Sequence, residues 1–144
     1  MPRLSLPLPP TCLVLGLISM IILHLAFPVF DVIGSPWRYL GSIPVVAGII
    51  LNLWADRLFK RHQTEVKPFR DSTSLIEDGP FRISRNPMYL GMILICAGAA
   101  ILLGSVTPFL VAAGIFWLLS RRFITVEEHD LERQFGNQYL RYRR

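Results

Sequence analysis

Long apolar runs dominate the first half of the chain. One covers residues 12–30, with polar side chains only at Ser19 and His24, and a second, shorter run covers residues 39–55. At about 1.5 Å of rise per residue, helices of these lengths reach across most of the roughly 30 Å hydrocarbon core of a bilayer. The pattern therefore predicts two membrane-spanning helices in this half of the chain.

The third apolar run is too long for one crossing. Residues 88–119 carry no charged side chain, and as one helix they would extend about 48 Å, against a hydrocarbon core of about 30 Å. The sequence GSVTP at 104–108 combines glycine, serine and proline, which favour a break. We therefore expect a hairpin of two short helices at 88–103 and 107–120, tilted or in a locally thinned bilayer.

The composition agrees with a bilayer as the solvent of this chain. Hydrophobic residues make up 52% of it and charged residues 17%, which is typical of a membrane protein. We expect an all-α integral membrane fold with four transmembrane helices and a cytoplasmic loop at 56–87, in a single domain over residues 1–144. Cys12 and Cys96 lie in apolar runs, so a disulfide framework is not expected. The sequence shows no metal-ligand cluster, and its N-terminal segment lacks the small-residue cleavage site of a removable signal peptide.

The basic residues gather in two regions. Lys and Arg number 15 against 10 Asp and Glu, which gives a net charge of +5. The first region holds Arg57, Lys60, Arg61, Lys67, Arg70, Arg82 and Arg85, and the second holds Arg121, Arg122, Arg133, Arg141, Arg143 and Arg144. Because Lys and Arg beside membrane spans favour the cytoplasmic side, an even number of crossings should separate the two regions. We expect a multi-pass protein with both termini in the cytoplasm, in a bacterial inner membrane, whose positive charge faces anionic lipid rather than nucleic acid.

Some residues inside the apolar runs are polar or unusually small. His24 and Asn52 need partners in hydrocarbon, so they either make a hydrogen bond between helices or line a pocket. Small residues in the third run, such as Gly91 and Gly98, either let another helix approach closely or leave room for a ligand.

The third run begins with the sequence RNP, which favours a helix start. Asn86 is a preferred N-cap residue, and Pro87 suits the first helical position. The free N–H groups and positive dipole of such a start also attract anions, and the neighbouring Arg82 and Arg85 either strengthen that attraction or contact lipid headgroups. Tyr89 is either an interfacial aromatic or the wall of a pocket.

The tail predicts an amphipathic cytoplasmic helix at 122–142. Its apolar side chains fall in one stripe at helical spacing: Ile124, Leu131, Phe135, Tyr139 and Tyr142. Glu128 lies inside this stripe and Glu127 at its edge, so each needs a cation or a set of donors, which means either a salt bridge to Arg121, Arg122 or a loop arginine, or a ligand. Gly136 weakens the helix and suggests a bend there.

Two of these motifs, taken in order, resemble a known family. GPFRISRNPMYLG at 79–91 precedes an apolar hairpin, which is followed by EEHDLERQFGNQYLRY at 127–142; TEVKPFRDSTSLIEDGPF at 64–81 fits the same pattern. Each motif alone is weak, but their order and spacing over residues 60–142 resemble the isoprenylcysteine carboxyl methyltransferase and phospholipid methyltransferase family of integral membrane enzymes.

The resemblance implies S-adenosyl-L-methionine as cofactor and methyl transfer to a lipophilic or membrane-embedded acceptor. The cofactor-binding residues that it implies are Gly79, Pro80, Arg85, Asn86, Pro87, Tyr89, Gly91, Glu127 and Glu128, and the implied catalytic residues are Glu128 and Arg122. The carboxyl-methylating branch usually has His where this chain has Asn86, and Arg where it has Phe123. Arg122 is one position away, about 100° round a helix, so the acceptor is not assigned to prenylcysteine.

Two other functions are compatible with the sequence. A nicotinamide-dependent membrane reductase of related architecture is one, and a small non-enzymatic membrane subunit is the other, because a fold does not fix a function.

Overall fold

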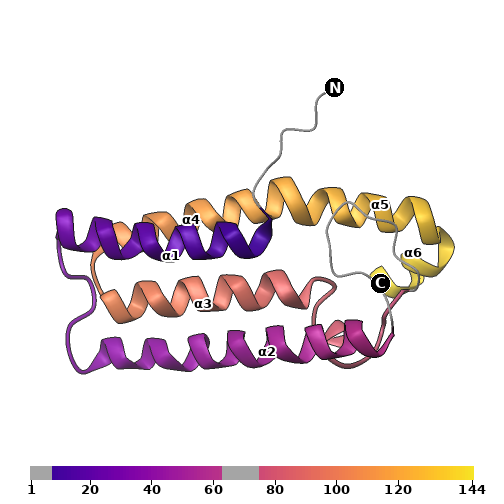
Figure 1. Cartoon of the computed structure of the whole chain (residues 1–144), viewed down its shortest axis with the longest axis horizontal. Helices are drawn as coiled ribbons and strands as arrows, with labels where there is room; N and C mark the ends of the chain where they lie inside the picture. The colour runs from indigo at the N-terminus through magenta and orange to yellow at the C-terminus, as the bar shows by residue number, and fades with distance from the viewer. Residues whose placement is uncertain (1–7, 63–74) are drawn as a thin grey trace.

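The computed structural model describes residues 8–62 and 75–144, and helices dominate both ranges (Figure 1). The basic residues Lys67 and Arg70, and most of the motif at 64–81, lie outside the described residues. In chain order the elements are α1 (Pro9–Ala26), the short 3-10 helix η1 (Trp37–Gly41), α2 (Ser42–Arg61), the 3-10 turn η2 (Gly79–Arg82), α3 (Pro87–Leu103), α4 (Val106–Leu119), the π-helical turn η3 (Ser120–Ile124), α5 (Thr125–Phe135) and α6 (Asn137–Arg143). The prediction of an all-α fold is confirmed for the described residues.

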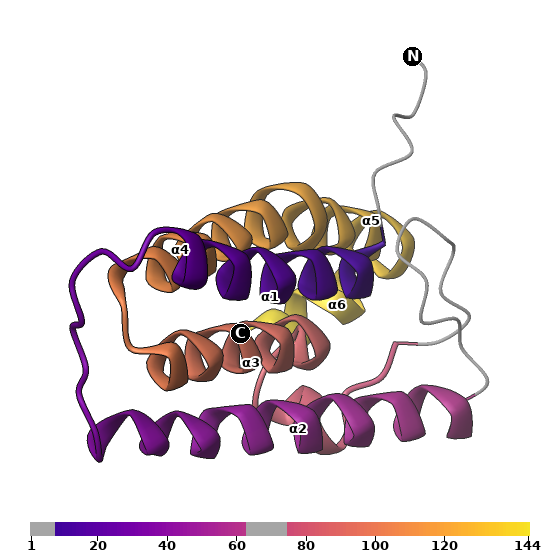
Figure 2. The same ribbon diagram turned by 60° about the vertical axis from the view of Figure 1, so that its left-hand side comes forward.

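Helix α3 lies in the middle of the bundle, with α2 on one side and the pair α1 and α4 on the other (Figures 1 and 2). Glycines make the contact between α2 and α3 close. A Cβ on Gly98 would lie 2.5 Å from the carbonyl oxygen of Gly41, and a Cβ on Gly91 would lie 2.8 Å from that of Gly48. Of the two interpretations of Gly91 and Gly98, the structure supports close helix approach.

The hairpin break in the third apolar run is confirmed. Helix α3 ends at Leu103, Gly104 takes a left-handed conformation with φ of 75°, and α4 begins at Val106. The carbonyl oxygen of Gly104 accepts hydrogen bonds from the backbone N–H groups of Val32 and Ile33, at 2.8 and 3.0 Å. The loop after α1 therefore fixes the turn of the hairpin.

Of the two polar residues inside the first spans, His24 makes a bond between helices. Its Nδ1 lies 2.7 Å from the hydroxyl of Ser105, a fully buried residue at the start of α4. The amide of Asn52 instead donates to the carbonyl of Gly48 in its own helix, at 3.1 Å. His24 thus joins α1 to the hairpin, whereas the bond of Asn52 stays within α2.

The first two helices differ in length from the predicted spans. Helix α1 covers Pro9–Ala26 instead of 12–30, because proline is favoured in the first turn and a residue before proline, here Phe27, avoids the helical conformation. Helix α2 continues to Arg61 instead of stopping at 55. Its last turns are charged but helix-compatible, and Lys60 pairs with Asp56 at 2.6 Å.

The separate C-terminal helix predicted at 122–142 is wrong in its boundaries. Helix α4 continues through the π turn η3 into α5, which ends at Phe135, and α6 follows after Gly136. No glycine or proline interrupts residues 115–135, so nothing forces the helix to stop at the end of the apolar run. The bend predicted at Gly136 is confirmed, since this residue has φ of 50°.

The surface of the bundle is that of an integral membrane protein. Within the described residues, the helical stretches Pro9–Ala26, Trp37–Arg61 and Val106–Phe135 are long and apolar enough to cross a membrane, and Pro87–Leu103 is a shorter apolar helix. Large apolar side chains point outward along them; Leu25, for example, is 74% exposed. Helix α5 carries several Glu, Asp and Arg side chains, so the apolar part of the third stretch is α4.

Candidate functional site

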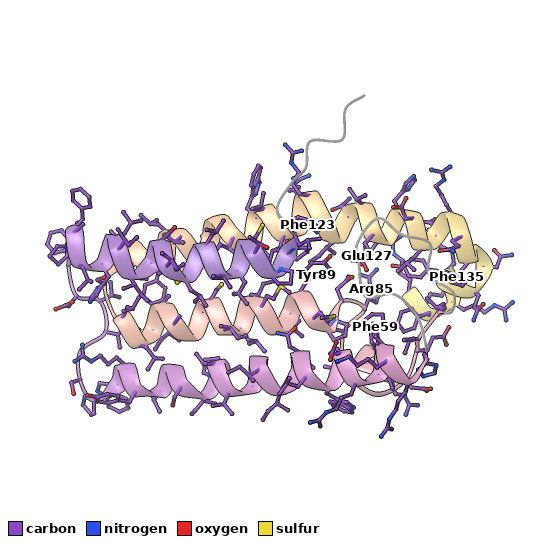
Figure 3. All side chains as sticks on the ribbon, in the orientation of Figure 1. Phe59, Arg85, Tyr89, Phe123, Glu127 and Phe135 are labelled. Carbon is purple, nitrogen blue, oxygen red and sulfur yellow. The ribbon has the colours of Figure 1, made fainter. Side chains whose placement is uncertain are left out.

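One end of the bundle encloses a cavity of about 180 Å³. The ends of four helices meet there: the starts of α1 and α3, the end of α2, and the first turns of α5. Most of the lining is apolar, including Phe59, Met88, Met92 and Leu131, and the polar contribution comes from Arg85, Asn86, Tyr89, Glu127 and Tyr142. Figure 3 shows Arg85, Tyr89 and Glu127 gathered between α3 and α5. The cavity is thus a mostly apolar space with charged side chains at one side.

Glu128 is held by two residues from the entrance to α3. The Nη1 atom of Arg85 lies 3.1 Å from Glu128 Oε1, an ion pair whose alignment falls short of a hydrogen bond. The side-chain amide of Asn86 donates to the same oxygen at 3.2 Å. The sequence left open whether Glu128 pairs with an arginine or with a ligand. The structure shows an ion pair with an arginine, Arg85, from the loop before α3.

The helix start at α3 agrees with the sequence in position but not in capping. Asn86 is the N-cap residue and Pro87 follows in the first turn, as predicted, but the Asn86 side chain does not cap the helix. Its amide is turned toward Glu128 instead. The Asn86 side chain thus bonds to Glu128 of α5 instead of to the backbone at the start of its own helix, and it leaves the first N–H groups of α3 without a side-chain cap.

Glu127 has the opposite environment to its neighbour. It lines the cavity, Tyr89 donates a hydrogen bond to its carboxylate, and its Oε2 is buried without a hydrogen-bond partner in the part of the chain that the structure describes. Burial raises the pKa of the Glu127 carboxyl above its ordinary value; the bond from Tyr89 opposes the shift, and the charges of Asp130 and Glu128 add to it. A buried carboxylate with one unused oxygen is suited to receive a cationic ligand.

Aromatic side chains form part of the cavity lining and pack against one another there. The rings of Tyr89 and Phe123 stack at 6.4 Å, and the rings of Phe59 and Phe81 meet edge to face at 5.3 Å. The hydroxyl of Tyr142 donates to the carbonyl oxygen of Phe81 at 2.6 Å and so ties α6 to η2. Burial raises the pKa of Tyr142 to about 12.

The remaining predicted site residues lie outside the cavity lining. Gly79 has φ of 59° and faces Trp54 of α2 at about 3.4 Å from its ideal Cβ position, and Gly91 faces α2. Pro80 is fully buried within η2. Arg122 is exposed on the π turn and is not among the residues that line the cavity. The structure thus brings together Arg85, Asn86, Pro87, Tyr89, Glu127 and Glu128, and it leaves the other four apart.

The sequence interpretation missed several residues of the site. Phe59, Phe81, Met88 and Met92 carried no signal beyond hydrophobicity, which is shared by half the chain. Tyr142 had a usable signal, because a tyrosine in an apolar stripe brings a hydroxyl that needs a partner.

The fold and the site define a class: an integral membrane helical protein with a mostly apolar cavity at the ends of its helices. Residues 37–138 match the family model described as phospholipid methyltransferase. The chain belongs to this phospholipid methyltransferase family.

Curated relatives agree with the family match. The chain is 31% identical over 104 residues to protein-S-isoprenylcysteine O-methyltransferase B of Arabidopsis thaliana, covering 71% of this chain and 53% of that protein. It is 33% identical over 70 residues to protein-S-isoprenylcysteine O-methyltransferase of Schizosaccharomyces pombe, covering 49% of this chain and 30% of that protein. The chain therefore spans about half the length, or less, of these relatives. No solved structure matches it.

Proposed function

We propose that this protein is a methyltransferase that uses S-adenosyl-L-methionine to methylate a lipophilic acceptor held in the membrane. One observation of the structure carries the proposal: the buried Oε2 of Glu127, which has no hydrogen-bond partner among the described residues, at a mostly apolar cavity. A carboxylate in such a place with only the Tyr89 hydroxyl as donor is costly unless a cation joins it. The family match and the names of the relatives support methyl transfer as the reaction.

The residues around the cavity fit the charges of this cofactor. S-adenosyl-L-methionine, when bound, supplies a methyl group on a positively charged sulfur, together with an amino and a carboxylate group. Glu127 offers negative charge for the cationic part, and Arg85 with the start of α3 offers positive charge for the carboxylate. Glu128 pairs with Arg85 and accepts a hydrogen bond from Asn86, so we assign Glu128 the role of positioning Arg85.

In this proposal the protein mainly aligns the reacting atoms and excludes water from them. Displacement at a methyl carbon requires the acceptor atom, the carbon and the leaving atom to lie in line, and it is favoured when water is excluded. The ring of Tyr89, which stacks on Phe123 behind it, and the side chains of Met88 and Met92 supply an apolar wall for this purpose. A carboxylate or thiolate acceptor needs no general base, whereas an ammonium must first lose a proton.

The proposed topology places the cavity at the cytoplasmic surface. With α1, α2, α3 and α4 each crossing the membrane, both basic regions and both termini face the cytoplasm, as the positive-inside rule favours. A polar cofactor then approaches from the cytoplasm, and an apolar acceptor reaches the cavity from the bilayer beside it.

Calorimetric titration of the detergent-purified protein with S-adenosyl-L-methionine and S-adenosylhomocysteine tests this function. We expect saturable binding that weakens at least about tenfold in Arg85→Ala and in Glu127→Gln, because each variant removes a charge-assisted contact. Asp130→Asn is the matched control: it removes an exposed carboxylate from the same helix and should bind normally. The absence of binding in a folded sample would refute the proposal, and unchanged binding in Glu127→Gln would refute the role of this residue.

A further inference from the structure

A second hollow, which we call the arginine cleft, lies beside the cavity. Its volume is about 620 Å³, and polar atoms dominate its walls. Among the described residues, four basic side chains line it, Arg82, Arg85, Arg143 and Arg144, against the single acidic side chain Glu77. The cleft therefore presents a clear excess of positive charge to solvent.

The arginines come from two distant parts of the sequence. Arg82 ends η2 and Arg143 ends α6. The hydrogen bond from Tyr142 to the carbonyl oxygen of Phe81 joins these two elements, and both of those residues line the cleft as well as the cavity. The fold thus holds like charges together at a fixed place, which is unfavourable unless an anion binds there.

The observed ion pairs neutralise the cleft only in part. Arg85 is paired with Glu128, while Arg143 lies 3.6 Å from Glu132, with both side chains nearly half exposed. An exposed pair at this distance contributes little and is easily exchanged for a better anion. Guanidinium groups match phosphate oxygens in a two-pronged geometry, so phosphate is the anion that this cleft suits best.

An apolar side chain beside the cleft favours a lipid over a free phosphate. Ile83 also lines the cleft, follows Arg82 directly and is 70% exposed. Four residues later Pro87 begins α3, an apolar helix. The cleft therefore lies at the boundary where a lipid headgroup meets its acyl chains. We propose that the arginine cleft binds the phosphate of an anionic membrane lipid, with Ile83 against the lipid's apolar part.

The cleft shares Arg85 with the proposed cofactor cavity, so its test changes other arginines and measures lipid binding alone. The full chain in detergent is titrated with phosphatidylglycerol or with phosphatidylcholine of the same acyl chains, and complexes are counted by native mass spectrometry. We expect a saturable one-to-one complex with phosphatidylglycerol that is about 30-fold weaker in the double variant Arg82→Gln/Arg144→Gln. Inorganic phosphate at millimolar concentration should fail to displace the lipid.

The control removes the same charge elsewhere on the same surface. Arg133→Gln/Arg141→Gln changes two exposed arginines of α5 and α6 that do not line the cleft, and it should keep the complex. If the control variant lost phosphatidylglycerol binding to the same extent, or if phosphatidylcholine bound equally tightly, binding would reflect a general attraction of lipid to the protein surface, and the proposed site would be overturned. Displacement by inorganic phosphate would overturn the lipid as its ligand.

Discussion

Two adjacent carboxylates, Glu127 and Glu128, have contrasting surroundings. Glu128 accepts from Asn86 and pairs with Arg85, whereas Glu127 is buried at the cavity with Tyr89 as its donor. One side chain is therefore used to build the site, and the other keeps an oxygen for a ligand. A buried carboxyl whose pKa is raised, such as that of Glu127, is a common feature of functional sites.

Glu127 should make the stability of the ligand-free protein fall as pH rises. Burial raises its pKa in the folded state above the ordinary value of 4.5, so the folded protein holds this proton more tightly than the unfolded chain does. Stability is then lost as pH rises from about 4.5 through the folded-state pKa, and it is constant above that. Glu127→Gln should remove this loss, so that it unfolds at a higher temperature than the unsubstituted protein at neutral pH.

Thermal unfolding of both proteins in detergent between pH 4 and pH 8 checks this expectation. Asp31→Asn, which changes an exposed carboxylate in the loop after α1 at the other end of the bundle, should keep the pH dependence. An identical pH dependence in Glu127→Gln would show that the Glu127 carboxyl is not strained by burial.

The sequence predicts the chemistry of single residues better than their partners. A carboxylate in an apolar stripe implied a cation or donors, and Arg85 supplies the cation for Glu128. The sequence could not show that Asn86 would bond to Glu128 rather than cap its own helix, because both options are open to the amide and the choice depends on where α5 lies. Tyr142 and Phe81 were missed for the same reason, since they are distant in sequence.

At the scale of elements, the close contact between α2 and α3 positions the site. The entrance to α3 carries Arg85 and Asn86, and glycines let α3 lie directly on α2. Membrane helices gain little from hydrophobic burial against lipid, so van der Waals contact of this kind supplies much of their association.

Gly98→Ala should therefore destabilise the bundle although alanine favours helices. The new Cβ would lie 2.5 Å from the backbone carbonyl oxygen of Gly41, which cannot move without separating the helices, and we expect a loss of about 1–3 kcal/mol. Gly114→Ala in α4 is the matched control, since no atom of the described residues lies within 4 Å of its Cβ position, and it should gain up to about 1 kcal/mol. Unfolding in mixed micelles of increasing denaturing detergent measures both, and equal stability of the two variants would contradict the packing argument.

Element boundaries followed from the sequence where glycine or proline mark them. Gly104 and Gly136 interrupt helices as expected, and Pro87 opens α3. The passage from α4 to α5 has no such residue, and the π turn that joins them includes a bond from the Thr125 hydroxyl to the carbonyl of Ser120 at 2.8 Å. A change from apolar to polar composition marks the edge of the bilayer, but it does not end a helix, and this is why the predicted boundary at 120 failed.

At the scale of the whole molecule, the two ends of the bundle differ in chemistry. The loop between α1 and α2 and the turn between α3 and α4 lie at one end, and α5 and α6 lie at the other (Figure 1). The cavity is lined by residues of this second end, such as Glu127 and Tyr142. Within the described residues, the first end has only Asp31 and Arg38 as charged side chains in its loops, whereas the second carries most of the arginines. The sequence could predict this difference between the two ends, because the charged segments lie between the apolar runs and the helices formed by those runs bring the segments to one end of the bundle.

Cysteine labelling should show which end faces the cytoplasm. Single cysteines are placed at Ser35, in the exposed loop of the sparsely charged end, and at His129, on the exposed face of α5. With inside-out vesicles, a membrane-impermeant thiol reagent should label His129→Cys but not Ser35→Cys, because basic regions favour the cytoplasmic side. The native Cys12 and Cys96 are buried and should stay unlabelled in the unsubstituted protein, and both new cysteines should react after detergent is added. Labelling of Ser35→Cys alone would reverse the orientation, and labelling of both before detergent would mean that the helices do not separate the two ends across the membrane.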